Sequence, residues 1–238
     1  RMFGQWLAVG LLGKITQTRR RFDAGTRRIL RFLQNMKPIA VNWKINLPNQ
    51  KQIREMWKQL KFEVVEDDFE FINLLKTNLG GLFHFKGFRV YENEIFDWFC
   101  SRGRLDEIDF DKNFLLSKRV LETFPYDIKT EQPHREIEKE PNFELKSEFV
   151  IDGELAALLF YGGAYGSEIK KTPKEVKSLA QDFCKELFGE KYTCDFVRYY
   201  TSNSAWNTWF IDFIIDYSYL IVCMETRTIW IIAYTDSD

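Results

Sequence analysis

The carboxylates near the end of the chain are the residues whose types and spacing come nearest to a catalytic pattern. Asp212 and Asp216 lie four residues apart in a segment rich in aromatic residues. On one strand they would share a face about 13 Å apart, which is too far for the carboxylate pair of a glycosidase. Asp212 could instead meet Glu225 or Asp236 from a neighbouring strand. Such a pair would suit a small-molecule-binding protein or a carboxylate-dependent hydrolase with a pocket between the two halves of the chain.

Other patterns that carry chemistry are weaker. His84 lies between Phe83 and Phe85 in a predicted strand, and His134 lies in a charged loop. Neither has the neighbours that a metal site or a Ser-His-Asp relay needs. The glycine-rich run at 162–166 matches neither the dinucleotide fingerprint nor the phosphate loop. We predict no metal, no cofactor and no catalytic residue, and we favour a non-enzyme.

The four cysteines, Cys100, Cys184, Cys194 and Cys223, lack the paired spacing of a metal site. Three of them lie in strongly apolar segments, so we expect buried free thiols in a reducing compartment, the cytoplasm. A disulfide between Cys184 and Cys194 is the alternative.

The net charge of −1 hides an asymmetry along the 238 residues. Residues 1–35 contain 8 basic residues and one acidic residue, a charge of +7, which leaves 26 basic and 34 acidic residues, or −8, for 36–238. The acidic body argues against nucleic acid as its main partner and permits electrostatic steering toward a basic protein, although a moderately acidic domain is also simply a soluble one. Aromatic residues make up 16% of the chain, and they suit both cores and interfaces, so their number does not choose between these uses.

Residues 1–35 form a basic leader. Its apolar run at 3–15 is too short to span a bilayer. A helix at 26–36 with a basic face could lie on an anionic membrane surface. The alternatives are a leader that is foreign to the native protein, or a basic helix docked on the acidic body.

The rest of the chain divides into two α+β parts, 36–124 and 143–238, separated by a charged linker with three prolines at 125–142. In the first part, hydrophobic periodicity and capping residues indicate three strands and four helices. The strands are expected at 39–45, 62–65 and 82–91, and the helices at 49–60, 68–75, 94–100 and 112–123.

The second part holds the best-marked helix of the chain. Thr172 is a good N-cap, Pro173 stands at the first helical position, Glu175 completes a capping box, and Gly189 ends the helix. A strand at 143–152 and a helix at 154–161 precede it. Four antiparallel strands follow, at 193–202, 206–215, 219–225 and 228–235. The predicted fold is α+β, an antiparallel β meander packed against helices in two closely packed parts.

Alternation along these strands defines two faces. One face is wholly apolar, and we assign it to the helix that begins at Pro173; it consists of Trp209, Ile211, Phe213, Ile215, Leu220, Val222, Met224, Ile229, Ile231 and Ala233. The other face mixes aromatic and acidic residues, so it is covered by the first half of the chain, by a second copy, or by another protein or ligand. From it we predict a partner-binding set: Trp206, Phe210, Asp212, Asp216, Trp230 and Tyr234.

Several segments of the last third carry a resemblance: Trp206-Asn207-Thr208-Trp209-Phe210, Asp216-Tyr217, Ile229-Trp230-Ile231-Ile232 and Thr235-Asp236-Ser237-Asp238. Together they resemble the C-terminal portion of uncharacterised bacterial α+β proteins, some similar in style to immunity proteins that neutralise toxins. The resemblance implies a cytoplasmic, non-enzymatic inhibitor that caps a basic partner with an acidic, aromatic face.

Overall fold

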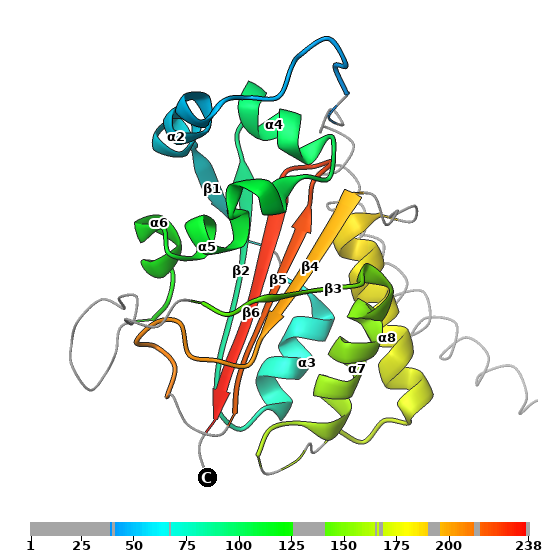
Figure 1. The fold of residues 1–238 in the computed structure, drawn as a ribbon. Coiled ribbons are helices and arrows are strands. Elements are labelled where there is room, and N and C mark those ends of the chain that lie inside the picture. The colour runs from blue at the N-terminus through cyan, green and yellow to red at the C-terminus, as the bar shows by residue number, and fades with distance from the viewer. Residues whose placement is uncertain are drawn as a thin grey trace, which may run out of the picture. The chain divides into compact units, whose positions relative to one another are not determined.

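The computed structural model of the chain describes residues 39, 41–66, 68–125, 141–164, 166, 169–189, 196–211 and 215–236. They belong to one compact unit, Ile39–Asp238. Its centre is a six-stranded antiparallel sheet with the order β1-β2-β6-β5-β4-β3 (Figure 1). The strands are β1 Phe62–Val65, β2 Leu82–Val90, β3 Glu144–Lys146, β4 Val197–Ser202, β5 Ile215–Cys223 and β6 Thr228–Asp236.

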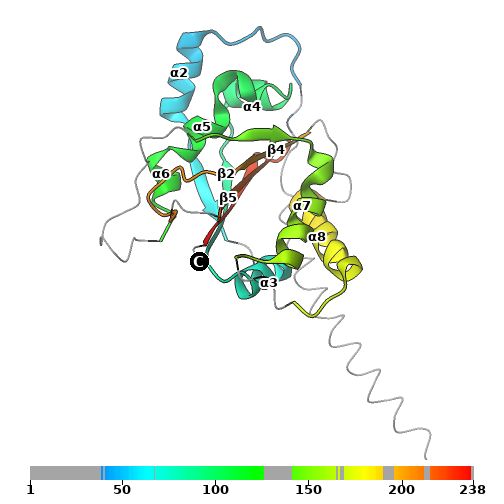
Figure 2. The same cartoon turned by 60° about the horizontal axis from the view of Figure 1, so that its bottom comes forward.

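Helices cover both faces of this sheet, which confirms the α+β class with an antiparallel sheet packed against helices (Figures 1 and 2). One face carries α4 Glu94–Cys100, the 3₁₀ helix η1 Leu105–Ile108, α5 Phe110–Leu115 and α6 Lys118–Leu121. The other carries α3 Glu70–Asn78, α7 Ile151–Tyr161, which follows the 3₁₀ helix η2 Glu148–Val150, and α8 Pro173–Phe188. Helix α2 Gln50–Gln59 lies near β1 and α4.

The two predicted parts of the chain share this single sheet. Strand β2 of the first part pairs with β6 of the second along eight residues, from Leu82 opposite Thr235 to Arg89 opposite Thr228. The leader at 1–35 and most of the linker, 126–140, lie outside the described residues.

The capping prediction for α8 is confirmed. The Thr172 hydroxyl accepts from the backbone N–H of Glu175, whose side chain accepts in return from the backbone N–H of Thr172. Gly189 follows the helix with a φ of 79°, a conformation that glycine adopts without a Cβ penalty. Asn49 and Gln52 form the same reciprocal cap on α2.

The assignment of sheet faces is wrong. The apolar face that was assigned to α8 lies under α4, α5 and α6, where Leu220, Val222 and Ile231 join the core cluster of Phe96 and Phe110. Helix α8 covers the opposite face. Because helices cover both faces, both are apolar, and strand alternation cannot tell which layer covers which face.

Several predicted elements also differ from the structure. Residues 41–45 and 206–210 contain turns and no strand, and β5 begins at Ile215. The predicted helix at 112–123 is broken, because Ser117 takes an extended conformation between α5 and α6. The predicted strand at 143–152 is reduced to β3, and α7 already begins at Ile151. Apolar residues at regular spacing also occur in turns and loops, where some of them pack on the core, as Ile45 and Phe143 do.

Candidate protein-interaction surface

Five of the six predicted partner-binding residues are buried, and Asp212 lies outside the described residues. Trp206 and Phe210 pack on the α4–α6 side of the sheet, where the Trp206 ring meets Phe124 edge-on at 5.3 Å. The Trp206 indole N–H donates to Ser218 Oγ at 2.8 Å. These side chains are covered from within the chain, in part by Phe124 of the first half, which is one of the three covers that the sequence left open.

Trp230 and Tyr234 lie on the opposite side of the sheet, under α3, α7 and α8. The Trp230 indole stacks on Phe85 with ring centroids 5.6 Å apart and meets Phe69 edge-on at 5.5 Å. It covers Gly87 of the neighbouring strand, where an added Cβ would lie 2.2 Å from the indole ring. Trp230 is thus a core residue fitted to a glycine.

The Tyr234 hydroxyl donates to Asp236 Oδ2, which also accepts from the backbone N–H of Ala164 at 3.1 Å. An added Cβ on Gly163 would lie 1.8 Å from the Tyr234 hydroxyl. Gly163 therefore has no room for a side chain where the glycine-rich run packs on the end of β6. Burial and the hydrogen bond to Asp236 raise the pKa of Tyr234.

The pocket predicted at Asp212 with Glu225 or Asp236 stays a prediction, because Asp212 lies outside the described residues. Glu225 lies in the β5–β6 turn and Asp236 at the far end of β6, about 27 Å away for a strand of nine residues. Asp216 is opposite Thr235 and accepts from its hydroxyl at 2.6 Å, while Asp236 is opposite Ile215 and so points to the other face. Among the described residues no group of three or more His, Cys, Asp or Glu side chains could hold a metal ion.

The cysteines and the histidine that the structure describes are in the core. Cys100, Cys184 and Cys223 are buried free thiols, as predicted, so Cys184 forms no disulfide; Cys194 lies outside the described residues. Burial raises the pKa of Cys184 to about 12, so its thiol stays protonated at neutral pH. His84 is buried and stacks on Phe124 at 3.9 Å, whereas His134 is not among the described residues.

A different group of residues is organised around one highly exposed side chain. We call it the Trp43 surface, and it consists of Trp43, Trp98, Arg102, Arg104 and the acidic side chains of residues 92–111. The Trp43 side chain is 80% exposed. The Arg102 guanidinium lies 5.3 Å from the Trp43 ring centroid and 4.3 Å from the Trp98 ring centroid, within cation–π range of both.

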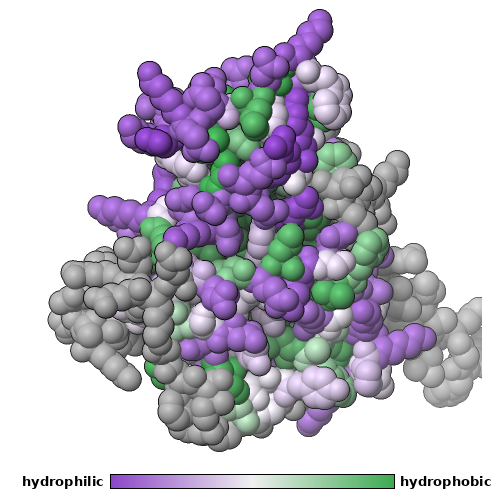
Figure 3. Space-filling model, viewed as in Figure 1, coloured by the Kyte–Doolittle hydropathy of each residue, from purple (hydrophilic) through white to green (hydrophobic). Residues whose placement is uncertain are grey.

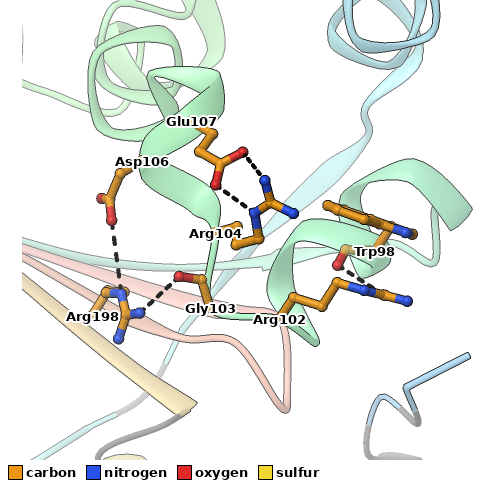
Figure 4. Close-up of polar contacts among 7 residues, drawn as sticks. All are labelled: Trp98, Arg102, Gly103, Arg104, Asp106, Glu107 and Arg198. Carbon is orange, nitrogen blue, oxygen red and sulfur yellow. Dashed lines mark hydrogen bonds and ion pairs between the residues drawn. The ribbon is translucent and has the colours of Figure 1, made fainter. Parts of the chain in front are cut away.

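Helix α4 and the turn after it position this group (Figure 4). Asn93 caps α4 by accepting from the backbone N–H groups of Ile95 and Phe96. The helix holds Trp98 so that its indole N–H donates to the backbone carbonyl of Ile45 at 3.0 Å. Arg102 donates to the carbonyl of Asn42 at 2.7 Å and to that of Trp98 at 3.2 Å. These bonds tie the segment that carries Trp43 to the end of α4.

Two further arginines fix the turn between α4 and η1 (Figure 4). Arg104 lies 5.1 Å from the Trp98 ring centroid and forms a two-pronged ion pair with Glu107. Arg198 of β4 donates to the carbonyl of Gly103 at 2.8 Å, and its Nε lies 4.0 Å from Asp106 Oδ2. The turn is therefore anchored from the sheet as well as from the helix.

The Trp43 surface is acidic in spite of its arginines. Residues 92–111 contain seven acidic and two basic residues, a charge of −5. Arg198, Arg227 and Lys44 add three positive charges beside them, which leaves −2. Burial, together with the charges of nearby acidic residues, raises the pKa of Asp111. An additional negative charge at this part of the surface would therefore be unfavourable.

The sequence holds a signal for this surface that the prediction did not use. Arg102-Gly103-Arg104 follows Trp98 closely and precedes a run of acidic residues. The sequence does not indicate that Trp43 is exposed. Trp43 alternates with Ile39, Val41 and Ile45, and this spacing is typical of a buried strand.

No helix among the described residues is long and apolar enough to cross a membrane. Comparison with protein-family models, with curated proteins and with solved structures finds no match. The likeness to immunity proteins therefore stays a prediction.

Proposed function

We propose that this chain is a non-enzymatic protein-binding module that binds a basic protein through the Trp43 surface. The observation that carries the proposal is the 80% exposed Trp43 indole, held against Arg102 on a surface with a net charge of −2. Trp and Arg are the residue types most enriched among those that dominate binding energy at protein interfaces.

The geometry favours binding because the anchor is already ordered. Arg102 donates to the backbone on both sides of the contact, at Asn42 and at Trp98, so the segment with Trp43 is held in place before any partner arrives. An anchor that is ordered in advance loses less conformational entropy on binding. A partner that covers Trp43 would remove a large apolar ring from water.

The charge defines the chemistry of the partner. Glu92, Glu94 and Asp109 are exposed and form no ion pair that the structure shows in the described residues. Such carboxylates steer a basic protein toward the surface and raise its association rate at low ionic strength. Inhibition of that partner, as the resemblance to immunity proteins implies, is the activity that we propose for the complex.

The test is capture of a partner on the immobilised full chain, followed by calorimetry with purified variants. We expect Trp43→Ala to weaken binding at least thirtyfold, because a residue that dominates an interface contributes about 2 kcal/mol or more. Arg102→Lys should weaken it too, since lysine keeps the charge but lacks the planar guanidinium. Tyr161→Ala is the matched control, because Tyr161 is 72% exposed on α7, on the other side of the sheet.

Two results would overturn the proposal. One is a captured partner that binds the Trp43→Ala variant as tightly as the parent chain. The other is an association rate that rises when salt is added, because attraction between an acidic surface and a basic partner is screened by salt.

A further inference from the structure

Strand β3 forms one edge of the sheet. Among the described residues it pairs with β4 alone, with Glu144 opposite Thr201 and Lys146 opposite Tyr199. A strand at a sheet edge presents backbone donors and acceptors that another strand can pair with.

Apolar side chains reach the surface beside this edge. Leu145 is 49% exposed, Phe149 of η2 is 73% exposed and Val150 is 39% exposed. Figure 3 shows hydrophobic side chains over the region of β3 and η2 with hydrophilic ones around them. Large apolar side chains that gather at a surface mark an interaction site more often than a single exposed residue does.

Strand β3 carries opposite charges on the two sides of Leu145, so it is complementary to an antiparallel copy of itself. Glu144 and Lys146 lie on the same face of the strand, with Lys146 Nζ 2.7 Å from Glu144 Oε2. If two β3 strands pair antiparallel about Leu145, each Glu144 stands opposite Lys146 of the second copy. The twofold axis creates this contact twice, as in an isologous interface. Opposite charges directly across from each other stabilise a strand pair.

We propose that a second copy of this chain pairs with β3, so that two six-stranded sheets join at this edge into a homodimer. The contact at its centre is Leu145 against Leu145, with Phe149 and Val150 of each copy beside it. This interface is separate from the Trp43 surface and does not depend on the function proposed for it.

The other edge of the sheet lacks this complementarity. Strand β1 contains one charged residue, Glu63, which accepts from the Tyr91 hydroxyl at 2.8 Å and lies 3.5 Å from Arg89 within the same sheet. Two β1 strands that paired antiparallel would bring no opposite charges together. The charge pattern therefore favours β3 as the edge that a second copy joins.

The test is the mass of the full chain in solution, measured by light scattering and sedimentation velocity across a concentration series. We expect a species of about twice the 28.5 kDa of one chain. Glu144→Lys and Lys146→Glu should each raise the dissociation constant roughly tenfold, because each puts like charges opposite each other at both symmetry-related contacts. The double variant restores opposite charges and should recover the dimer.

Val64→Lys is the control, because Val64 is exposed on the opposite edge strand, β1. It should leave the dimer unchanged, and so should Trp43→Ala. Circular dichroism establishes that each variant is folded. A chain that stays monomeric at the highest concentration overturns the proposal, and so does a dimer that neither single charge reversal weakens.

Discussion

The contact between Trp230 and Gly87 allows a sharp test of whether Trp230 is a core residue. In the structure the indole lies over the glycine of the neighbouring strand, stacked on Phe85 and braced edge-on by Phe69. The perturbation is Gly87→Ala, made in the parent chain and again in a Trp230→Leu variant. The new methyl group would lie 2.2 Å from Cζ3 and 2.6 Å from Cε3 of the indole.

The expected magnitudes follow from this geometry. Phe85 and Phe69 hold the ring on two sides, so in the parent chain Gly87→Ala forces overpacking that costs about 2 kcal/mol. Trp230→Leu alone costs about 3 kcal/mol, because it leaves a partly empty site in the core. With the indole gone, the alanine has room, and the second substitution should cost close to nothing. The two changes should therefore be coupled by about 2 kcal/mol.

The assay is urea unfolding followed by circular dichroism. With a slope of about 2 kcal/mol per molar urea, a 2 kcal/mol change moves the midpoint by about 1 M. Gly153→Ala in α7 is the matched control, because its nearest contact is the flexible end of Lys177 and alanine favours a helix. If Gly87→Ala costs the same in both backgrounds, the two residues do not meet as the structure has it, and the placement of Trp230 is refuted.

Two further predictions concern pH and an ion pair. Burial is the largest cause that raises the pKa values of Tyr199, Tyr200 and Tyr234. Above about pH 10 these hydroxyls therefore stay protonated in the folded chain, whereas they lose their protons in the unfolded chain. The free energy of unfolding should then fall as pH rises past about 10, and a urea midpoint that stays flat to about pH 11 would contradict this. Arg227 forms a two-pronged ion pair with Asp97 and has a φ of 57°, so Arg227→Ala should cost about 2 kcal/mol and Arg227→Gly less, as urea midpoints would show. Equal midpoints for the two variants would contradict the account of the left-handed backbone.

Local signals in the sequence predicted the helices best. The threonine, proline and glutamate at 172–175 specify the start of α8 through bonds within four residues, so no tertiary information is needed. The same holds for α4, which occupies the predicted residues 94–100. Strands β1 and β2 were also found, because Gly80-Gly81 and the acidic residues after Val65 delimit them.

The arrangement of the layers and the candidate site depend on contacts far apart in the sequence. Nothing near Trp206 indicates that its indole N–H will bond Ser218 and its ring will meet Phe124. Likewise the position of Trp43 depends on Arg102, about sixty residues later, whose guanidinium donates a hydrogen bond to the backbone carbonyl of Asn42. An aromatic residue gives the same sequence pattern in a buried turn, in a strand or on the surface. The pattern alone therefore could not indicate which aromatic residues form the proposed interface.

The position of β6 has a consequence for biosynthesis. It is the last strand along the described chain, yet it lies between β2 and β5, and all nine of its residues are buried. Until a ribosome has released Thr228–Asp236, the paired strands β1 and β2 and the strands β3, β4 and β5 have no strand to join them. During this time the nascent chain contains two incomplete parts of the sheet, and each has an unpaired edge between apolar faces that can associate with other chains. We expect it to fold only after synthesis of β6, at a rate limited by these distant pairings, and to need protection from aggregation until then.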